Sequence, residues 1–123
     1  MKILIAEDEE SLVKVLQEKF EKEHFTVQTV SSGDMVLPNV KAFHPDIVLL
    51  DIILPKKTGL VILQELKSDP ETKEIPVIMV SNLDGDEQIK EAIKYGAVDY
   101  LVKSQHPINE VVEVVNNTIA HLK

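Results

Sequence analysis

The sequence predicts an α/β fold in which a parallel sheet carries helices on both faces. Short apolar runs alternate along the chain with stretches whose apolar residues recur at helical spacing. Residues 47–50 are apolar throughout and lie between turn-forming residues, as expected of a strand buried on both faces. Ligands collect beyond the carboxyl ends of such strands. Asp51 follows this run directly, so it is either a binding residue or a cap of the next loop.

Length and composition indicate one globular domain. The chain has 123 residues, 44% of them hydrophobic, and we expect a single domain over residues 1–123. The net charge is −8 and all 13 basic residues are Lys, which argues against nucleic acid or an anionic membrane as a direct partner. There is no Cys, signal peptide or transmembrane run, so the sequence favours a cytoplasmic protein without disulfides or thiolate metal sites.

The first half of the chain supplies three strands and two helices. We expect strands over residues 3–6, 26–30 and 47–50, with the second near a sheet edge. A helix is predicted from about 11 to 23, with Val13, Leu16 and Phe20 on its core face. Another is predicted from about 34 to 43, where Pro38 should kink or delay it.

The second half repeats the same alternation. Helices are predicted over residues 59–68, 86–95 and 107–122, and strands over 75–81 and 98–103. Thr58 is a candidate cap of the first of these helices, and Gly96 a left-handed cap of the second. The inward residues expected on the last helix are Val111, Val112, Val115, Ile119 and Leu122.

Five strand–helix units with right-handed crossovers favour a doubly wound, flavodoxin-like (βα)5 sheet of order 2-1-3-4-5. Its topological switch point lies between the first and third strands. Those strands deliver Glu7, Asp8 and Asp51, while the fourth ends at Ser81 and the fifth at Lys103. We therefore expect these five side chains at one edge of the sheet.

Three carboxylates in one cleft repel one another unless a cation lies among them. Oxygen ligands without His or Cys favour Mg²⁺ or Mn²⁺. A facing ammonium and hydroxyl complete a site for a phosphoryl group, and a carboxylate there can act as its nucleophile. The four histidines share no metal-ligand spacing, so we expect them at the surface.

The whole chain resembles the receiver domain of two-component response regulators, including stand-alone, CheY-like members. The resemblance rests on the motifs ILIAEDE, PDIVLLD with LP and TGL after it, PVIMVS, and GAVDYLVK, in order at family-like spacing. It implies a phosphoacceptor that catalyses its own phosphorylation and dephosphorylation. Asp51 would be the phosphorylated residue, with Ser81 and Lys103 contacting the phosphate. Tyr100 would be the aromatic partner of Ser81 in the switch.

By the same resemblance, Mg²⁺ would be held by Asp8 directly, by Glu7 through water, and by Asp51 and the backbone carbonyl of Ile53. Two departures stand out. Ser104 follows Lys103 where the family usually has a cis proline, which predicts a trans peptide and a differently shaped loop. Ile53 and Leu83 stand at two positions whose side chains set the rate of phosphate hydrolysis in the family, and here both are apolar. Our hypothesis is that they crowd the attacking water and prolong the phosphorylated state.

The implied donor is a phosphohistidine on a sensor histidine kinase or a histidine phosphotransfer domain. Ser11, Leu12 and Val15 form a candidate docking edge for it, although Leu12 can equally rim the core. The implied output face is the fourth helix, fifth strand and fifth helix. With no basic residue on the fifth helix before Lys123, we expect a monomer.

The sequence ends at Lys123 and predicts no output domain. A phosphorylation-independent interaction module with the same fold remains the alternative function. A flavin-binding protein is disfavoured because four acids, residues 7–10, occupy the position of its phosphate loop.

Overall fold

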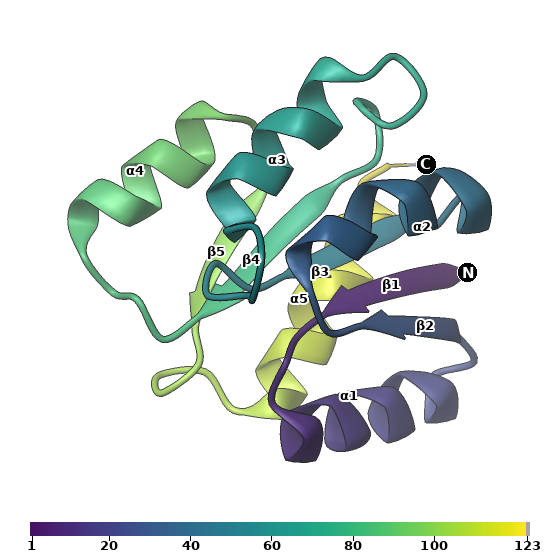
Figure 1. Cartoon of the computed structure of the whole chain (residues 1–123). Coiled ribbons are helices and arrows are strands. Elements are labelled where there is room, and N and C mark those ends of the chain that lie inside the picture. Colours follow the sequence, from purple (N-terminus) through teal and green to yellow (C-terminus); the bar gives the residue numbers. More distant parts are fainter. Residues whose placement is uncertain (123) are drawn as a thin grey trace.

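The fold is a five-stranded parallel sheet covered by helices on both faces, as predicted (Figure 1). The computed structural model describes residues 1–122, so Lys123 lies outside the described residues. The elements in chain order are β1 (Lys2–Ala6), α1 (Glu10–Lys22), β2 (Thr26–Val30), η1 (Gly33–Met35), α2 (Val36–Phe43), β3 (Ile47–Leu50), α3 (Gly59–Ser68), β4 (Val77–Ser81), α4 (Asp86–Lys94), β5 (Asp99–Val102) and α5 (Ile108–Ala120).

The strand order is β2-β1-β3-β4-β5, which confirms the predicted flavodoxin-like order and places β2 at an edge. All neighbouring strands are parallel, with β1 lying between β2 and β3. The register pairs Ala6 of β1 with Leu50 of β3, so the last residues of these two strands lie side by side. The residues that follow both strands therefore emerge at the same point of the sheet.

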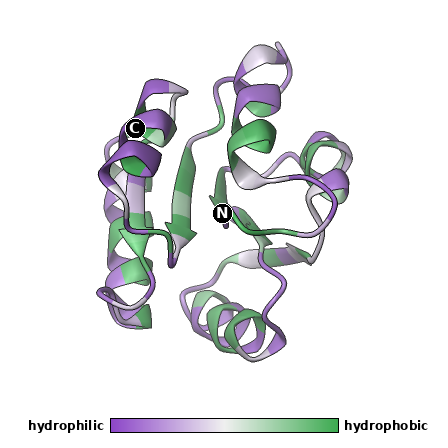
Figure 2. Cartoon of the chain, turned by 60° about the vertical axis from the view of Figure 1, so that its left-hand side comes forward, coloured by the Kyte–Doolittle hydropathy of each residue, from purple (hydrophilic) through white to green (hydrophobic). Residues whose placement is uncertain are grey.

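The alternating side chains of the strands divide the core into two layers. One layer joins β-strand residues such as Leu4 and Leu50 to α2, α3 and α4. The other joins residues such as Ile5 and Leu49 to α1 and α5. In Figure 2 the strands are mostly hydrophobic in colour, whereas the loops that surround them are mostly hydrophilic. Because both faces are covered, β3 is buried at all four positions.

The predicted helices are present, with differences at their ends. The predicted helix over residues 34–43 divides into the 3-10 turn η1 and α2, which begins at Val36. Pro38 is thus the third residue of α2, in the first turn, where its missing N–H costs no helical hydrogen bond. Thr58 is the N-cap residue of α3 but makes no side-chain capping bond. Gly96 follows α4 with φ of 108°, as its predicted left-handed conformation requires.

Three expected core positions differ in the structure. Leu16 and Phe20 are buried, but Val13 is only half-buried. On the last helix Val111, Val115 and Ile119 are buried and Val112 is half-buried. Leu122 is 57% exposed because α5 ends at Ala120, so its expected inward orientation is wrong.

Candidate functional site

Four strands deliver polar residues to one edge of the sheet. Glu7 and Asp8 follow β1, Asp51 follows β3, Ser81 is the last residue of β4, and Lys103 follows β5. Backbone hydrogen bonds continue the sheet past the strand ends and fix these positions. The Asp51 amide donates to the Ala6 carbonyl at 3.1 Å, and the Lys103 amide donates to the Ser81 carbonyl at 2.9 Å.

The carboxylates of Glu7, Asp8 and Asp51 converge, with one oxygen from each within 4.8 Å of the others. Glu7 and Asp51 are buried, Asp51 being 5% exposed, whereas Asp8 is exposed to solvent. The backbone amide of Glu9 donates to the Glu7 carboxylate at 3.1 Å and orients it. Carboxylate oxygens without nitrogen or sulfur donors fit a hard divalent cation such as Mg²⁺.

Lys103 contacts two of these carboxylates, those of Glu7 and Asp51. Its Nζ atom lies 2.8 Å from Oδ2 of Asp51 and 2.5 Å from Oε1 of Glu7. Burial opposes the charged ammonium, but the hydrogen bonds to Asp51 and Glu7 outweigh it and raise the pKa of Lys103. Burial also raises the pKa of Glu7, which the hydrogen bond from Lys103 offsets only in part. A partly buried ammonium is therefore held against the Asp51 carboxylate.

The loop after Lys103 contains no cis bond. Among residues 1–122 every peptide bond is trans, including Lys103–Ser104, as its sequence predicts. Lys103 nevertheless reaches Asp51. The amides of Gln105 and His106 both donate to the Val102 carbonyl, which turns the chain directly after β5. Pro107 then stands at the N-cap position of α5.

Ser81 and Tyr100 belong to β4 and β5, the two strands beyond β3 in the sheet order. Ser81 is fully buried, and the Leu83 amide lies 3.4 Å from its Oγ atom. The Tyr100 ring is buried in the core, and its hydroxyl donates to the Leu83 carbonyl at 2.5 Å. Burial raises the pKa of Tyr100, which keeps the hydroxyl protonated as a donor. Leu83 thus connects the aromatic ring to the strand end that carries Ser81.

Apolar side chains border the mouth of the site. The Ile53 side chain is 58% exposed, while its amide donates to Oδ1 of Asp51 at 3.2 Å. Leu83 is half-buried. On α1, Ser11 is exposed, Val15 is 40% exposed, and Leu12 packs partly against the core. The exposed residues of the candidate docking edge are therefore Ser11 and Val15.

Two features of the site have no signal in the sequence pattern. Gly59 lies against the backbone of Asp51, and a Cβ atom there would come 2.1 Å from the Asp51 carbonyl oxygen. The Glu9 amide orients Glu7, whereas the sequence explains Glu9 fully by the helix dipole. In the sequence, Thr58 and Gly59 indicate a helix start and form part of the motif TGL, but neither observation predicts the contact of Gly59 with Asp51.

Comparison with known proteins is consistent with this arrangement. The sequence model of the response regulator receiver domain matches residues 3–116. The chain is 36% identical over 110 residues to the response regulator PleD of Caulobacter vibrioides, covering 89% of this chain and 24% of PleD. The chain belongs to the response regulator receiver family.

Solved receiver structures share the whole fold. The receiver domain of the Francisella response regulator 1452 superposes with a TM-score of 0.90 at 28% identity, covering 99% of this chain and 98% of that domain. The phosphorylated cyanobacterial phytochrome response regulator RcpA superposes with a TM-score of 0.79 at 28% identity, covering 95% of this chain and 89% of RcpA. The chain spans about a quarter of the length of PleD.

Receiver domains as a family are phosphorylated on an aspartate, generally bind Mg²⁺, and interact with histidine kinases or phosphotransfer proteins. This chain carries an acidic cluster compatible with such a metal. Within residues 1–122, no helix has the length and apolarity needed to span a membrane.

Proposed function

We propose that this receiver domain accepts a phosphoryl group on Asp51. A carboxylate oxygen of Asp51 attacks the phosphorus of a phosphohistidine whose other ring nitrogen carries a proton, so that the P–N bond breaks and the neutral imidazole leaves. With acetyl phosphate the P–O bond breaks instead and acetate leaves. Asp51 is prepared for this role because one of its oxygens faces Lys103 and the other accepts the amide of Ile53. The proposal rests on this single arrangement around a buried carboxylate.

Asp8, Glu7, Asp51 and the backbone carbonyl of Ile53 would hold Mg²⁺, with Mn²⁺ as a substitute. Their carboxylates form the acidic cluster of the described chain, and their oxygen donors suit these ions. When bound, the cation supplies charge that neutralises the phosphoryl oxygens. Lys103 neutralises a further oxygen, and for this its ammonium only has to shift from the carboxylates that it contacts now.

Ser81 and Tyr100 would carry the signal away from Asp51. The Ser81 hydroxyl donates to a phosphoryl oxygen, which draws the end of β4 towards the site. Leu83 moves with that segment, and its carbonyl holds the Tyr100 hydroxyl. Tyr100 belongs to β5, so the change reaches the surface formed by α4, β5 and α5, where the downstream protein binds.

The donor would be a sensor histidine kinase or a histidine phosphotransfer domain that docks on Ser11, Leu12 and Val15 of α1. These residues start at the second position of the helix that follows the acidic cluster. A donor helix along this edge places its phosphohistidine over Asp51. We expect the unphosphorylated domain to be a monomer.

The deciding experiment is the intact mass of the protein after incubation with acetyl phosphate and Mg²⁺. We expect a gain of ~80 Da for one covalent phosphoryl group, and no gain for Asp51→Ala or without Mg²⁺. Circular dichroism confirms that the variant is folded. If folded wild-type protein gains no mass from acetyl phosphate or from a phosphohistidine donor, the proposal is wrong. The chain would then act as a phosphorylation-independent interaction module.

A further inference from the structure

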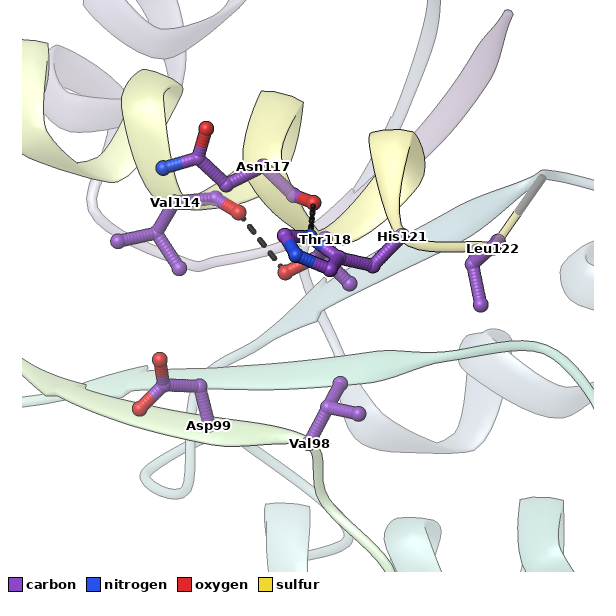
Figure 3. A pocket seen from close by; sticks show the side chains of 7 residues that line it. All are labelled: Val98, Asp99, Val114, Asn117, Thr118, His121 and Leu122. Atoms are coloured by element: carbon purple, nitrogen blue, oxygen red, sulfur yellow. Dashed lines mark hydrogen bonds between the residues drawn. The ribbon is translucent and has the colours of Figure 1, made fainter.

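Two adjoining hollows form a groove between the edge strand β5 and helix α5. The first has a volume of about 360 Å³ and is lined by Val98 and Asp99 on one side and by α5 and the residues after it on the other (Figure 3). The second has a volume of about 540 Å³ and continues along β5 towards the start of α5. They share Asp99, Val114 and Asn117, so together they make one continuous surface, named here the β5–α5 groove.

The two ends of the β5–α5 groove differ in chemistry. At one end the apolar side chains of Val98 and Leu122 are 53% and 57% exposed, and both line the same hollow. At the other end lie Glu110 and Glu113, and Asp99 lies between the ends. The described residues that line the groove include no lysine but two histidines, His106 and His121, and Nδ1 of His106 lies 2.8 Å from a carboxylate oxygen of Glu110. The groove is therefore amphipathic and acidic.

The open edge of β5 is partly closed to an added strand. The Tyr100 amide donates to the side chain of Asp99 at 2.8 Å. The Val102 carbonyl accepts the amides of Gln105 and His106. A partner strand would have to displace these bonds before it could pair with the sheet. An occupant that binds through side chains avoids that cost.

A second copy of the chain also fits poorly. In a symmetric pair the same patch lies on both subunits. With the two-fold axis along the groove, Asp99, Glu110 and Glu113 face the same three acids of the other copy, and like charges repel. With the axis across the groove, Asp99 faces Asp99, and Glu110 and Glu113 lose water against Val98 and Leu122 without gaining a partner. A cationic partner gains from the same charges.

We propose that the β5–α5 groove binds a cationic, amphipathic segment of a partner protein. Its Lys or Arg groups pair with Glu110, Glu113 and Asp99, and one apolar side chain packs between Val98 and Leu122. Tyr100 lines the groove and contacts Leu83, so the wall of the groove is joined to the Asp51 site. Control of binding by phosphate rests on the proposed function, whereas binding itself does not.

The test is a titration of unphosphorylated, ¹⁵N-labelled protein with a short synthetic peptide that carries Lys and Leu on opposite faces of a helix. We expect amide shifts in β5 and α5. The variant Glu110→Gln/Glu113→Gln should bind about tenfold more weakly. Its matched control, Glu18→Gln/Glu21→Gln, removes the same charge from exposed positions of α1 and should change the affinity less than about twofold. A third variant, Val98→Ser, should also weaken binding.

Three results would overturn this inference. The peptide shifts could map to the acids of residues 7–10, the two double variants could lose affinity equally, or Val98→Ser could bind as tightly as the wild type. Sedimentation of the unmodified protein as a dimer that the Glu110→Gln/Glu113→Gln change strengthens would assign the groove to a second copy. The mass assay on Asp51 is read separately, so a protein that binds the peptide but gains no phosphoryl group contradicts only the proposed function.

Discussion

Gly59, the first residue of α3, lies directly against the backbone of Asp51, the candidate phosphoacceptor. A Cβ atom on Gly59 would lie 2.1 Å from the carbonyl oxygen of Asp51. The Gly59 amide donates to the Ile52 carbonyl at 2.8 Å, which holds the two segments at this separation. The backbone of Asp51 is thus positioned by a helix that begins eight residues later. Only a residue without a side chain fits there.

Replacing Gly59 with Ala should therefore disturb both stability and the site. We expect Gly59→Ala to lower the free energy of unfolding by about 1–3 kcal/mol, as overpacking does, and to slow phosphorylation by acetyl phosphate. Urea unfolding and intact mass measure the two effects. Gly85→Ala is the control, because its Cβ would meet only the flexible Gln88 side chain. Equal unfolding midpoints for the two variants would contradict this account.

Lys103→Met should destabilise the protein in a way that Mg²⁺ reverses. Removing the ammonium leaves Glu7 and Asp51 as buried charges without a partner, which costs about 3 kcal/mol. A cation among the carboxylates replaces the lost charge. Thermal unfolding with and without Mg²⁺ should show a larger metal-dependent rise of Tm in Lys103→Met than in the wild type. The exposed Lys90→Met serves as control. The same rise in all three proteins would argue against the site.

Ile53→Asn/Leu83→Glu should shorten the life of the phosphorylated protein. Ile53 and Leu83 lie at the rim of the site, and we expect their apolar side chains to exclude the attacking water. Polar replacements that orient a water should accelerate hydrolysis by about tenfold. The decay of the phosphorylated mass, after removal of acetyl phosphate, measures this rate. Val61→Asn on α3 should leave it unchanged, and an unchanged rate in the double variant would refute the hypothesis.

Val15→Asp should block phosphoryl transfer from a phosphohistidine donor while leaving the reaction with acetyl phosphate intact. Val15 is 40% exposed on α1 and contributes little to the core. Leu12→Asp should do the same but also lower stability, because Leu12 packs partly against the core. Val61→Asp is the control for an exposed apolar residue of another helix. Normal transfer by both α1 variants would remove α1 from the docking surface.

The pair Lys41–Asp69 should make stability depend on pH in the acid range. The hydrogen bond from Lys41 and the amide of Glu71 hold the pKa of Asp69 below its ordinary value. The stabilising contribution is therefore complete above the unfolded pKa of about 3.9 and is lost as the pH falls through the lower native pKa. The difference in Tm between wild type and Asp69→Asn should be present at pH 7 and vanish in strong acid. A difference that is constant with pH would rule this out.

The sheet could be predicted because the residue patterns that specify each strand lie within a few consecutive residues. Residues 47–50 are apolar at each position, and a polar residue follows each of several strands, so the edge that carries the site could be predicted from alternation alone. The bounds were less predictable where proline intervenes. β4 begins at Val77 instead of residue 75, and Pro76 contributes only its carbonyl, which accepts the Val48 amide.

What depends on three-dimensional contact could not be predicted. His24 and His44 have positive φ values of 68° and 53° just beyond α1 and α2, although glycine is the residue usually expected there. The close contact between Gly59 and the backbone of Asp51 forms only when α3 packs on the sheet. The paired hollows beside β5 require the exposure of Leu122, which helical periodicity placed inside.

The site takes its side chains from β1, β3, β4 and β5, so its charges come from nearly the whole length of the chain. A product of interrupted translation that ends before β5 would carry the acids without the ammonium of Lys103, and without the strand that bears Tyr100. Such a fragment has no ammonium to face the carboxylates of Glu7 and Asp51. Truncated chains of this kind would therefore lack both the charge that faces Asp51 and the proposed switch residue.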